Sequence, residues 1–347
     1  GFGQNLKSKQ NLIDKKLKTY IKLAQNELTQ KKSIIKKNSD KIRGLLITHG
    51  HEDHIGSIPY LLDHVNIPIY APPFASELIY KKLKRRRSKQ KLDLVPITVG
   101  NPLKIGGFFV EWFNVCHSIP DSTGLSIDTP NGKIIHTGDF KIDHTPADGN
   151  GSDLSRLSYY GSKGVLLLLS DSTYSEVPGY TPSESVVGEA LDIAIGKAQG
   201  RVLVATFASL ISRIQQVLDA AYKHGRKVAV VGRSMVNNVN MSIDLGYLKP
   251  APGVLLTLAD MDRMPSNEVV IITTGSQGEP SSALVRIANK SHKDISVIPG
   301  DTVIISASAI PGNETLITKT IDNMFRQGAS VLYDKIALVH VHGHASQ

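Results

Sequence analysis

The stretch ITHGHEDHIG (residues 47–56) places three imidazoles and two carboxylates within six residues, directly after a short apolar run. Borderline metals such as zinc favour imidazole nitrogens and carboxylate oxygens as ligands. The candidate ligands in this stretch are His49, His51, Asp53 and His54. A tight turn can aim all four side chains at one point, whereas a polar turn with surface histidines is the plainer alternative. Glu52 is expected to point away, as a solvated carboxylate or one that only supports the ligands.

Two later strand ends supply further candidates. His117 follows the run FFVEWFNV, and Asp139 follows the run KIIHTG. An aspartate can bridge two metal ions because each of its carboxylate oxygens can bind one ion. Alone, His117 would be interpreted as a structural histidine and Asp139 as a turn cap, so their weight comes from the combination with the His-rich turn. We interpret His136, His144 and Cys116 as non-ligands, the cysteine being a packing residue.

Short apolar runs must position these side chains. Strands are expected over residues 44–48, 68–71, 108–115, 125–128, 133–138 and 165–170. Helices are expected over residues 11–37, where apolar residues recur at three-to-four spacing, and over IPYLLDH at 58–64. The polar clusters therefore follow strands in a strand-rich first half.

After the loop SEVPGYTPSE the pattern changes. RVLVATF, SLISRIQQVLDAAYKHG and RKVAVVG predict a strand–helix–strand unit, and VVIITTG and TVIISAS continue it. Strands that alternate with helices indicate a parallel sheet with helices on its faces. We expect a domain boundary near residues 178–184.

The composition favours a two-domain intracellular protein. The chain has 347 residues, of which 41% are hydrophobic, enough for sizeable cores. No apolar run approaches the roughly 18 residues of a membrane span, and the Lys-rich N-terminus lacks the apolar core of a secretory signal. Cys116 is the only cysteine, so no intrachain disulfide can form. We expect a cytoplasmic protein with no membrane contact.

The charge points to a polyanionic partner. The net charge is +9, and residues 1–43 alone hold eleven Lys and one Arg against three acidic residues. A second basic run, KKLKRRRSKQK, spans residues 81–91. Such patches attract nucleic acid through phosphate contacts and counterion release. A solvated face is the alternative for both runs, and the three consecutive Arg of the second run make it the better candidate for phosphate contact.

HGHEDH resembles the signature of the metallo-β-lactamase superfamily. Four later motifs resemble, in order, those of its β-CASP nucleases, specifically of the ribonuclease J family: LSDST (169–173), TFASLISRIQQ (206–216), TTGSQGEP (273–280) and HVHGHASQ (340–347). HSIPDS (117–122) and HTGDF (136–140) are also typical of that family. The resemblance covers roughly residues 42–347.

The resemblance implies an α/β fold, a metallo-β-lactamase αββα sandwich with an inserted β-CASP α/β domain whose parallel sheet is flanked by helices. Residues 1–180 would form the metallo-β-lactamase domain, with an atypical Lys-rich helix at 1–43, and residues 181–347 the β-CASP domain. The return to the first domain and a C-terminal domain are expected to be missing from this chain, as segments omitted from a longer protein.

The resemblance also implies two zinc ions, with Mn²⁺ or Mg²⁺ as alternatives. One ion would be held by His49, His51 and His117, the second by Asp53 and His54, with Asp139 bridging the two. Two family features find no counterpart in the sequence: an early aspartate in a V-D-x-G-like context and the closing histidine ligand. The ligand shell is therefore expected to be incomplete in these 347 residues.

Further site residues follow from the same resemblance. Asp171 and His344 correspond to a proton-transferring pair, with a strand-end cap and a surface imidazole as the alternatives. Substrate phosphate is expected to contact His340, Val341, His342, Gly343, His344, Ser276 and Gly278. A plain loop is the alternative for TGSQGEP. In the family the middle residue of the run 340–344 is commonly Ser, so His342 is a departure.

The implied function is a metal-dependent ribonuclease that uses a metal-activated hydroxide to hydrolyse RNA phosphodiester bonds. It would act as a 5′-to-3′ exonuclease and endonuclease leaving 5′-phosphate products, in rRNA processing and mRNA decay. The expected partner is single-stranded RNA with a 5′-monophosphate, held in a channel between the domains, and the expected assembly is a homodimer or homotetramer. Alternatives are a DNA-directed β-CASP nuclease, a small-molecule metallo-hydrolase and a catalytically silent RNA-binding scaffold.

Overall fold

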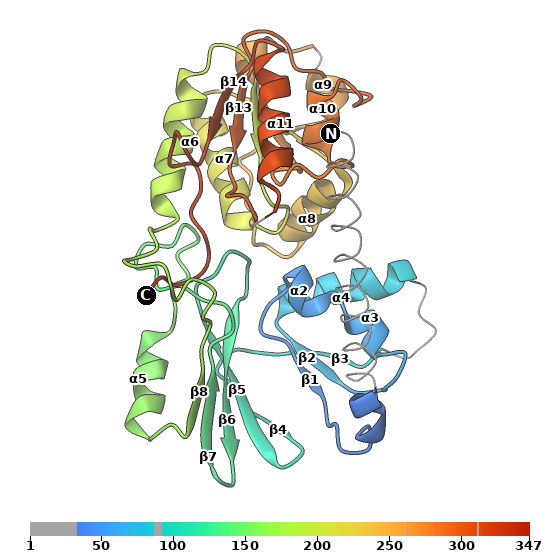
Figure 1. The fold of residues 1–347 in the computed structure, drawn as a ribbon, viewed down its shortest axis with the longest axis vertical. Helices are drawn as coiled ribbons and strands as arrows, with labels where there is room; N and C mark the ends of the chain where they lie inside the picture. The colour runs from blue at the N-terminus through green and yellow to red at the C-terminus, as the bar shows by residue number, and fades with distance from the viewer. Residues whose placement is uncertain (1–32, 87–91, 262, 311) are drawn as a thin grey trace, which may run out of the picture.

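The computed structural model of the protein describes residues 33–86, 92–261, 263–310 and 312–347. Its ribbon divides into a lower part, coloured blue to green, and an upper part, coloured yellow to red (Figure 1). Of the helix expected over residues 11–37, only residues 33–37 are described, and they are helical; the remainder of that prediction lies outside the described residues. The basic run at 81–91 is likewise described only up to residue 86.

The lower part begins with a parallel sheet and the helices that cover it. The sheet has the order β1-β2-β3, with β1 at Leu45–Leu46, β2 at Ile69–Ala71 and β3 at Leu94–Pro96. The helices are α2 (Glu52–Ile55), α3 (Ile58–Leu61) and α4 (Pro73–Arg86). Proline suits the first position of α4, since it has no N–H group to leave unpaired there. The buried face of α4 includes Phe74, Ala75, Ile79 and Leu83.

A second sheet of the lower part has the order β4-β5-β6-β7-β8. Its strands are β4 (Leu103–Ile105), β5 (Phe108–Asn114), β6 (Thr123–Thr129), β7 (Gly132–His136) and β8 (Leu167–Leu169), and α5 (Leu154–Ser162) precedes β8. Neighbouring strands are antiparallel except β7 and β8, which are parallel. The strands expected from the sequence in this half are thus present, with bounds that differ by a few residues.

Apolar clusters stack these elements into four layers. One cluster joins α2, α3 and α4 to the first sheet. Between the two sheets lies Trp112, which is fully buried and whose indole N–H donates to the carbonyl of Ile47 at 3.1 Å. On the far side, Phe113 of β5 packs against Tyr160 of α5, with 5.7 Å between ring centroids. The order helix–sheet–sheet–helix confirms the expected αββα arrangement.

Among the described residues, strand β8 is an edge of the second sheet with no partner on its outer side. The side chains from Leu166 to Leu169 are all exposed, so the strand presents leucines on both of its faces. An unpaired edge of this kind can accept a further strand through its free backbone groups.

The upper part is built on one parallel sheet of order β11-β10-β12-β9-β13-β14. In chain order its strands are β9 (Val202–Ala205), β10 (Lys227–Val231), β11 (Leu255–Leu256), β12 (Val269–Thr273), β13 (Thr302–Ile305) and β14 (Ser330–Tyr333). Its helices are α6 (Ser185–Lys197), α7 (Ile211–Lys223), α8 (Arg233–Asp244), α9 (Leu258–Met261), the 3-10 turn η1 (Ser266–Glu268), α10 (Ala283–Ala288) and α11 (Glu314–Phe325). The predicted strand–helix–strand unit is β9–α7–β10.

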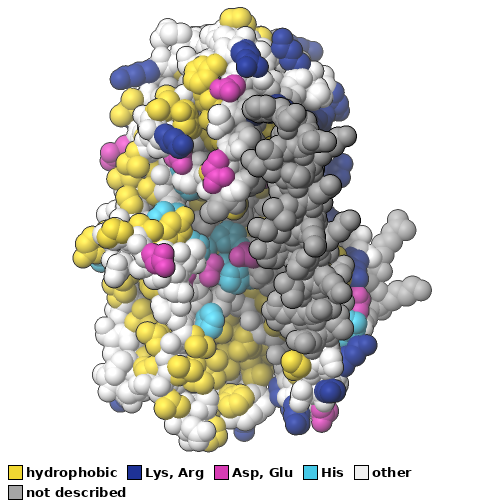
Figure 2. All heavy atoms as spheres, viewed as in Figure 1, with side chains coloured by type: hydrophobic (Ala, Val, Ile, Leu, Met, Phe, Trp, Pro, Cys, Tyr) yellow, Lys and Arg dark blue, Asp and Glu magenta, His cyan; other side chains and the backbone are white. Residues whose placement is uncertain are grey.

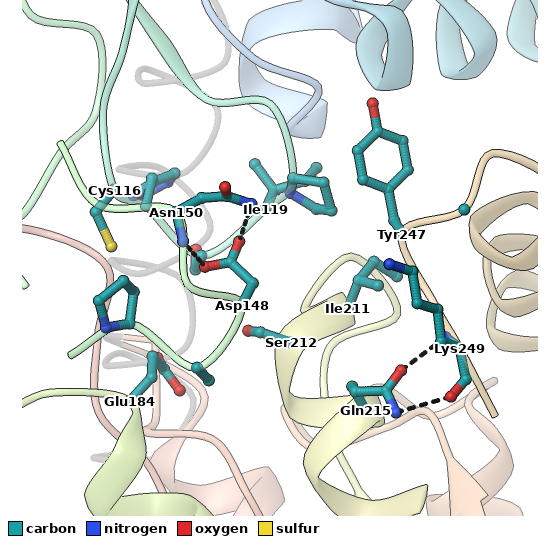
Figure 3. A pocket seen from close by; sticks show the side chains of 16 residues that line it. Cys116, Ile119, Asp148, Asn150, Glu184, Ile211, Ser212, Gln215, Tyr247 and Lys249 are labelled. Atoms are coloured by element: carbon teal, nitrogen blue, oxygen red, sulfur yellow. Dashed lines mark hydrogen bonds between the residues drawn. The ribbon is translucent and has the colours of Figure 1, made fainter. Parts of the chain in front are cut away.

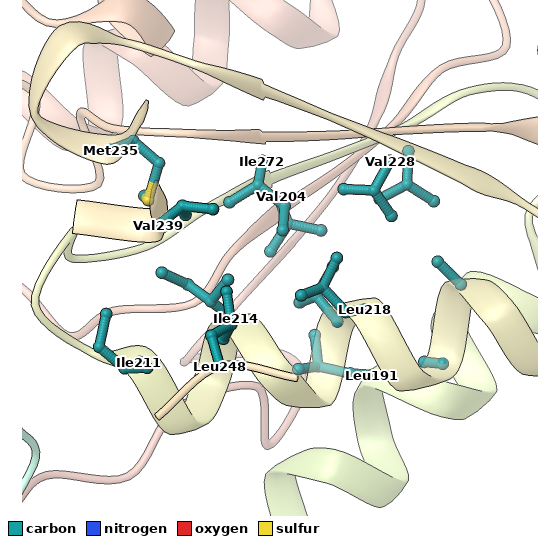
Figure 4. Packing of buried hydrophobic residues seen from close by; sticks show 14 of the residues in the cluster. Leu191, Val204, Ile211, Ile214, Leu218, Val228, Met235, Val239, Leu248 and Ile272 are labelled. Atoms are coloured by element: carbon teal, nitrogen blue, oxygen red, sulfur yellow. The ribbon is translucent and has the colours of Figure 1, made fainter. Parts of the chain in front are cut away.

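Both faces of this sheet are buried, because successive strand residues point to opposite sides. Val202 and Val204 of β9 face α6, α7 and α8, whereas Leu203 and Ala205 face α10 and α11. Figure 4 shows the first of these cores, with Val204, Val228 and Ile272 of the sheet lying against Leu191, Ile214 and Leu218 of the helices. Residues after β14 leave the sheet and run down to the lower part (Figure 1). Within the described ranges, no helix is long and apolar enough to cross a membrane.

Candidate metal and catalytic site

The His-rich turn is fixed by both sheets of the lower part. The N–H of Ile47, directly after β1, donates to the carbonyl of Tyr70 in β2 at 2.9 Å. The carbonyl of Thr48 accepts from the N–H of Thr123 in β6 at 3.0 Å and from the Thr123 hydroxyl at 2.7 Å. Because the chain is held by both sheets directly before His49, the ligand-type side chains that follow start from a rigid support.

Four imidazoles and a carboxylate converge at this turn. His117 Nε2 lies 3.1 Å from His51 Nδ1. Asp139 Oδ2 lies 3.2 Å from His54 Nε2, 3.6 Å from His49 Nε2 and 3.8 Å from His117 Nε2. Figure 2 shows histidines and acidic side chains gathered in the middle of the visible face, between the two parts of the molecule. Residues that are about 90 positions apart in the sequence thus form one cluster.

The cluster contains two groups of potential metal ligands. In each group the ligand atoms lie within 4.8 Å of one another. The groups are His49, His51, His117 and Asp139, and Asp53, His54 and Asp139. Asp139 belongs to both, which is the grouping that the sequence resemblance implied for two metals and a bridging carboxylate.

Burial keeps the imidazoles of the first group neutral. Desolvation, followed by the charges of neighbouring imidazoles, holds the pKa of His49 far below its usual range. Desolvation also lowers the pKa of His51 to about 4 and that of His117 to about 3. A neutral imidazole has a free lone pair, and His49 Nε2 is buried with no hydrogen-bond partner among the described residues. Orphaned buried nitrogens next to a carboxylate are the donor set of a borderline metal, so these residues fit such an ion.

The second group carries the negative charge. Burial alone would raise the pKa of Asp139, but the hydrogen bond from His54 and the nearby imidazoles lower it overall. The same hydrogen bond raises the pKa of His54. Asp139 is therefore ionised at neutral pH, and it offers its oxygens to both ligand groups.

Residues expected to be non-ligands lie outside the cluster. Glu52 is exposed and pairs with Lys82 of α4, so it points away as expected. His136 Nδ1 accepts from the N–H of Gly138 at 2.9 Å, and His144 is exposed. Cys116 is buried, and burial raises the pKa of its thiol to about 12. It is a packing residue rather than a thiolate ligand.

A second pair, Asp171 and His344, borders the cluster. His344 Nδ1 lies 2.7 Å from Asp171 Oδ2, and the His344 ring centroid lies 5.0 Å from that of His117. Partial burial raises the pKa of Asp171, but the hydrogen bonds from His344 and Thr173 outweigh it and lower the pKa to about 2. Asp171 also accepts from the N–H of Phe140 at 3.2 Å, so the carboxylate is held from several sides.

The segment that carries His344 is bound to the candidate metal ligands. His117 Nδ1 lies 2.7 Å from the carbonyl of Gly343. A carbonyl can only accept, so Nδ1 carries the proton and Nε2 keeps the lone pair that points to the cluster. The N–H of Ala345 donates at 2.8 Å to the carbonyl of Phe140, the residue that follows Asp139. The end of the upper part thus orients ligands of the lower part.

Close approach explains the glycine at 343. A Cβ built on Gly343 would lie 2.7 Å from His117 Nδ1 and 2.9 Å from the N–H nitrogen of Ser118. We expect Gly343→Ala to push the His117 ring out of place and to weaken zinc affinity by about ten- to a hundredfold, the usual effect of disturbing a residue that orients a metal ligand. Zinc titration of the metal-stripped protein measures this. Gly161→Ala is the matched control, because nothing lies within 4 Å of its added Cβ; equal affinities for the two variants would contradict the prediction.

A buried charge network, which the sequence did not reveal, fixes the start of this segment. Arg213 of α7 is fully buried and pairs with Glu184, and it donates to Ser306 and to the carbonyl of Val339 at 2.9 Å. Lys141, also fully buried, lies 3.3 Å from Asp143 and 3.9 Å from Glu184. Arg213 belongs to TFASLISRIQQ, a motif whose sequence alone does not indicate a role for this arginine. Removing one partner of such a buried pair would leave an uncompensated buried charge and would strongly destabilise the fold. The network therefore holds the two parts together in one arrangement.

The remaining predicted phosphate contacts lie deeper in the upper part. Val341 is buried, and His340 is largely desolvated, which lowers its pKa to about 3. Ser276 is 3% exposed, and Gly278 approaches Leu316 of α11 so closely that a Cβ would lie 2.7 Å from its backbone. No hydrogen bond or ion pair found among the described residues joins the loop of Ser276 and Gly278 to the His/Asp cluster. Their contact with substrate stays a prediction.

A cavity of about 330 Å³ lies beside the cluster, between the two parts. It is lined by the stretch 116–120, by Asp148 and Asn150, and by the first turns of α7 (Figure 3). Tyr247 donates from its hydroxyl to Asp121 across this boundary, and its ring packs edge-on against Phe74 at 5.4 Å. These contacts tie the loop after His117 to the upper part.

Two family models match the chain. The model "Ribonuclease J, beta-CASP domain" matches residues 199–324, and the model "Metallo-beta-lactamase superfamily" matches residues 20–174. A solved protein of unknown function from Enterococcus faecalis V583 is similar in fold, with a TM-score of 0.59, 12% identity, and coverage of 87% of this chain and 70% of that one.

Several curated relatives are similar in sequence. Ribonuclease J of Helicobacter pylori (strain J99) is 47% identical over 313 residues, which are 89% of this chain and 45% of that protein. Ribonuclease J of Synechocystis is 47% identical over 90% of this chain and 49% of that protein. Ribonuclease J2 of Bacillus subtilis is 42% identical over 91% of this chain and 57% of that protein. The chain spans about half the length of these relatives. The chain belongs to the metallo-β-lactamase superfamily and, within it, to the β-CASP family of the ribonuclease J type.

Proposed function

We propose that the protein is a metal-dependent ribonuclease that hydrolyses phosphodiester bonds of single-stranded RNA. The observation that carries the proposal is the Asp171–His344 pair, whose imidazole lies 5.0 Å from the ring of the candidate ligand His117. A group that can donate a proton stands next to a group that can hold metal, which is what hydrolysis of a phosphodiester needs. The name ribonuclease J of the curated relatives supports the choice of RNA.

The metals would be held by the two ligand groups that share Asp139. When bound, two divalent ions, zinc by ligand type with Mn²⁺ or Mg²⁺ as alternatives, supply Lewis-acid activation of water and neutralise phosphate charge. Within the protein, His117 keeps its Nε2 lone pair free because its Nδ1 donates to Gly343. The neutral imidazoles need no deprotonation before they bind at pH 7, since desolvation has already lowered their pKa values.

Asp171 and His344 would supply the proton for the leaving group. Asp171 accepts from Nδ1 of His344, so the other ring nitrogen, Nε2, is the atom that can donate to the departing 3′ oxygen. The ionised carboxylate stabilises the protonated ring and fixes its orientation. Water is the nucleophile in this scheme, so the product would carry a 5′-phosphate.

Finer features belong to the same proposal. The protein would act as a 5′-to-3′ exonuclease and an endonuclease, with residues 1–180 and 181–347 as its two domains. The segment from His340 to His344, with Ser276 and Gly278, would contact substrate phosphate. A homodimer or homotetramer and a cytoplasmic location complete the proposal. It is supported by the resemblance of the motifs and by the names of the relatives.

One experiment tests the proposal against a DNA-directed nuclease and a silent RNA-binding scaffold. RNA and DNA oligomers of one sequence, each with a 5′-monophosphate, are incubated with the metal-loaded protein, and the product ends are mapped. Cleavage of RNA in preference to DNA, with 5′-phosphate ends, is the expected result. Preference for DNA would favour the DNA-directed nuclease. Binding of RNA without cleavage at any of the three metals would leave only the scaffold.

A further inference from the structure

An aromatic stack lies directly beside the Asp171–His344 pair. The rings of Tyr174 and His342 are nearly parallel, with 3.9 Å between centroids and 7° between planes. The same tyrosine ring lies 5.8 Å from the His344 ring at 30°. Tyr174 therefore contacts both imidazoles that flank Gly343, and its own position in the chain is three residues after Asp171.

The backbone joins the same two segments. Tyr174 and Ser346 form a parallel β-bridge, and the N–H of Gln347 donates to the carbonyl of Val177 at 2.9 Å. The Thr181 hydroxyl donates to the carbonyl of His344 at 2.7 Å. The segment that carries Asp171 and the segment that carries His344 thus run side by side, and the Tyr174 ring of the first lies against the imidazoles of the second.

The stack depends on the departure at position 342. In the resembling family this position is commonly a serine, which has no ring for Tyr174 to stack on. His342 Nδ1 is buried without a hydrogen-bond partner in the described structure. The 3.9 Å ring stacking on Tyr174 therefore helps to hold the side chain in place. Parallel aromatic rings at this distance attract each other beyond the effect of burial.

We propose that Tyr174 and His342 are positioning residues for phosphodiester hydrolysis: their stack holds His344 in register with Asp171. This inference rests on the proposed function. In this positioning role both side chains act through His344, and the role is separate from the phosphate contact proposed for the segment 340–344. They restrict the backbone and ring of His344, so that its Nδ1 stays at Asp171 while Nε2 faces the substrate. Such preorganisation affects the rate of the chemical step more than substrate binding, because the leaving group takes its proton only in the transition state.

The test uses variants that separate the ring from its bulk and its hydroxyl. Tyr174→Phe keeps the ring and is expected to behave like the wild type. Tyr174→Leu keeps apolar volume without the ring and is expected to lower kcat about three- to tenfold at unchanged KM. His342→Ser restores the residue common in the family and is expected to lower kcat by the same factor. The double variant is expected to lose no more than the worse single variant, because both remove one contact. Tyr180→Ala is the control, since Tyr180 is 99% exposed in the same loop.

Nuclear magnetic resonance of the His344 ring gives a readout that does not need activity. In the metal-free wild type, the Nδ1 proton shared with Asp171 is expected to give one sharp signal, which shifts or broadens in Tyr174→Leu and His342→Ser but not in Tyr174→Phe or Tyr180→Ala. An unchanged signal in Tyr174→Leu would overturn the inference, as would equal losses in the Phe and Leu variants. A wild type that cleaves no RNA refutes the proposed function alone, because the ring signal still reports on the positioning.

Discussion

Replacing His51 with alanine is expected to remove metal binding by the first ligand group and to lower RNA cleavage by more than about a hundredfold. Even a residue that only hydrogen-bonds to a metal ligand contributes about ten- to a hundredfold to metal affinity or activity. Loss of a ligand itself is therefore expected to lower both by more. His51 Nδ1 lies 3.1 Å from His117 Nε2, so its removal leaves an incomplete set of nitrogens beside Asp139. The measurements are zinc stoichiometry by calorimetric titration of the metal-stripped protein and the rate of RNA cleavage.

The fold should survive this substitution. His51 precedes α2 at its N-cap position but makes no side-chain capping hydrogen bond there, so alanine removes no cap. Desolvation lowers the pKa of His51 to about 4, so no positive charge is lost at neutral pH. His144→Ala removes an exposed imidazole outside the cluster and is the matched control. In the wild type and the control, added zinc should raise the unfolding midpoint, because the assembled site binds it more tightly than the unfolded chain does. A His51→Ala variant with full zinc stoichiometry and normal cleavage would show that the ligand assignment is wrong.

The candidate ligands were predictable because their signals are local. His49, His51, Asp53 and His54 lie within six residues, and no other role explains that density as well. His117 and Asp139 could be added because each follows an apolar strand, and strand ends of packed sheets meet at one edge. Their convergence depends on the register of β5, β6 and β7, which a single sequence does not reveal. The prediction therefore named the residues, and the fold supplied their distances.

Helix α4 was missed because its apolar face is narrow. Phe74, Ala75, Ile79 and Leu83 are buried, but Lys81, Lys82 and the last three basic residues surround them. The run KKLKRRRSKQK is strongly basic, although three of its described cations pair with nearby acids: Lys81 with Glu77, Lys82 with Glu52, and Arg86 with Asp63. A run of like charge in a sequence can thus be partly neutralised by residues that only the fold brings close.

The positioning residues could not be predicted for a different reason. Arg213 and Tyr174 act through contacts with segments more than 100 residues away, such as Val339 and Ser346. Their residue types are common in helices and loops, so nothing in their local spacing marks them. The departure at His342 was the one visible signal, and its meaning appears only when the Tyr174 ring is found stacked upon it.

Replacing Asp171 with asparagine is expected to lower kcat by about a hundred- to ten-thousandfold, the usual range for loss of general acid–base catalysis, while zinc stoichiometry stays unchanged. Asparagine keeps the shape and one acceptor oxygen, but it removes the negative charge that stabilises a protonated His344. It also sets an NH₂ group among the donors from Phe140 and Thr173, which now point at a carboxylate. His344→Gln should lower kcat by about the same factor. The double variant should lower kcat little further, because the two side chains act as one unit.

The matched control for this pair is Asp334→Asn, which removes an exposed carboxylate from the segment after β14. Single-turnover cleavage and zinc titration of the same samples distinguish residues that support the metal ligands from residues that transfer protons. Because His117 Nδ1 contacts the carbonyl of Gly343, next to His344, a loss of zinc in Asp171→Asn would mean that the pair supports the ligands instead of transferring protons. Normal zinc binding with slow cleavage of the bond, and additive losses in the double variant, would indicate two independent roles. Normal zinc binding with non-additive losses is the result expected of a proton-transferring pair.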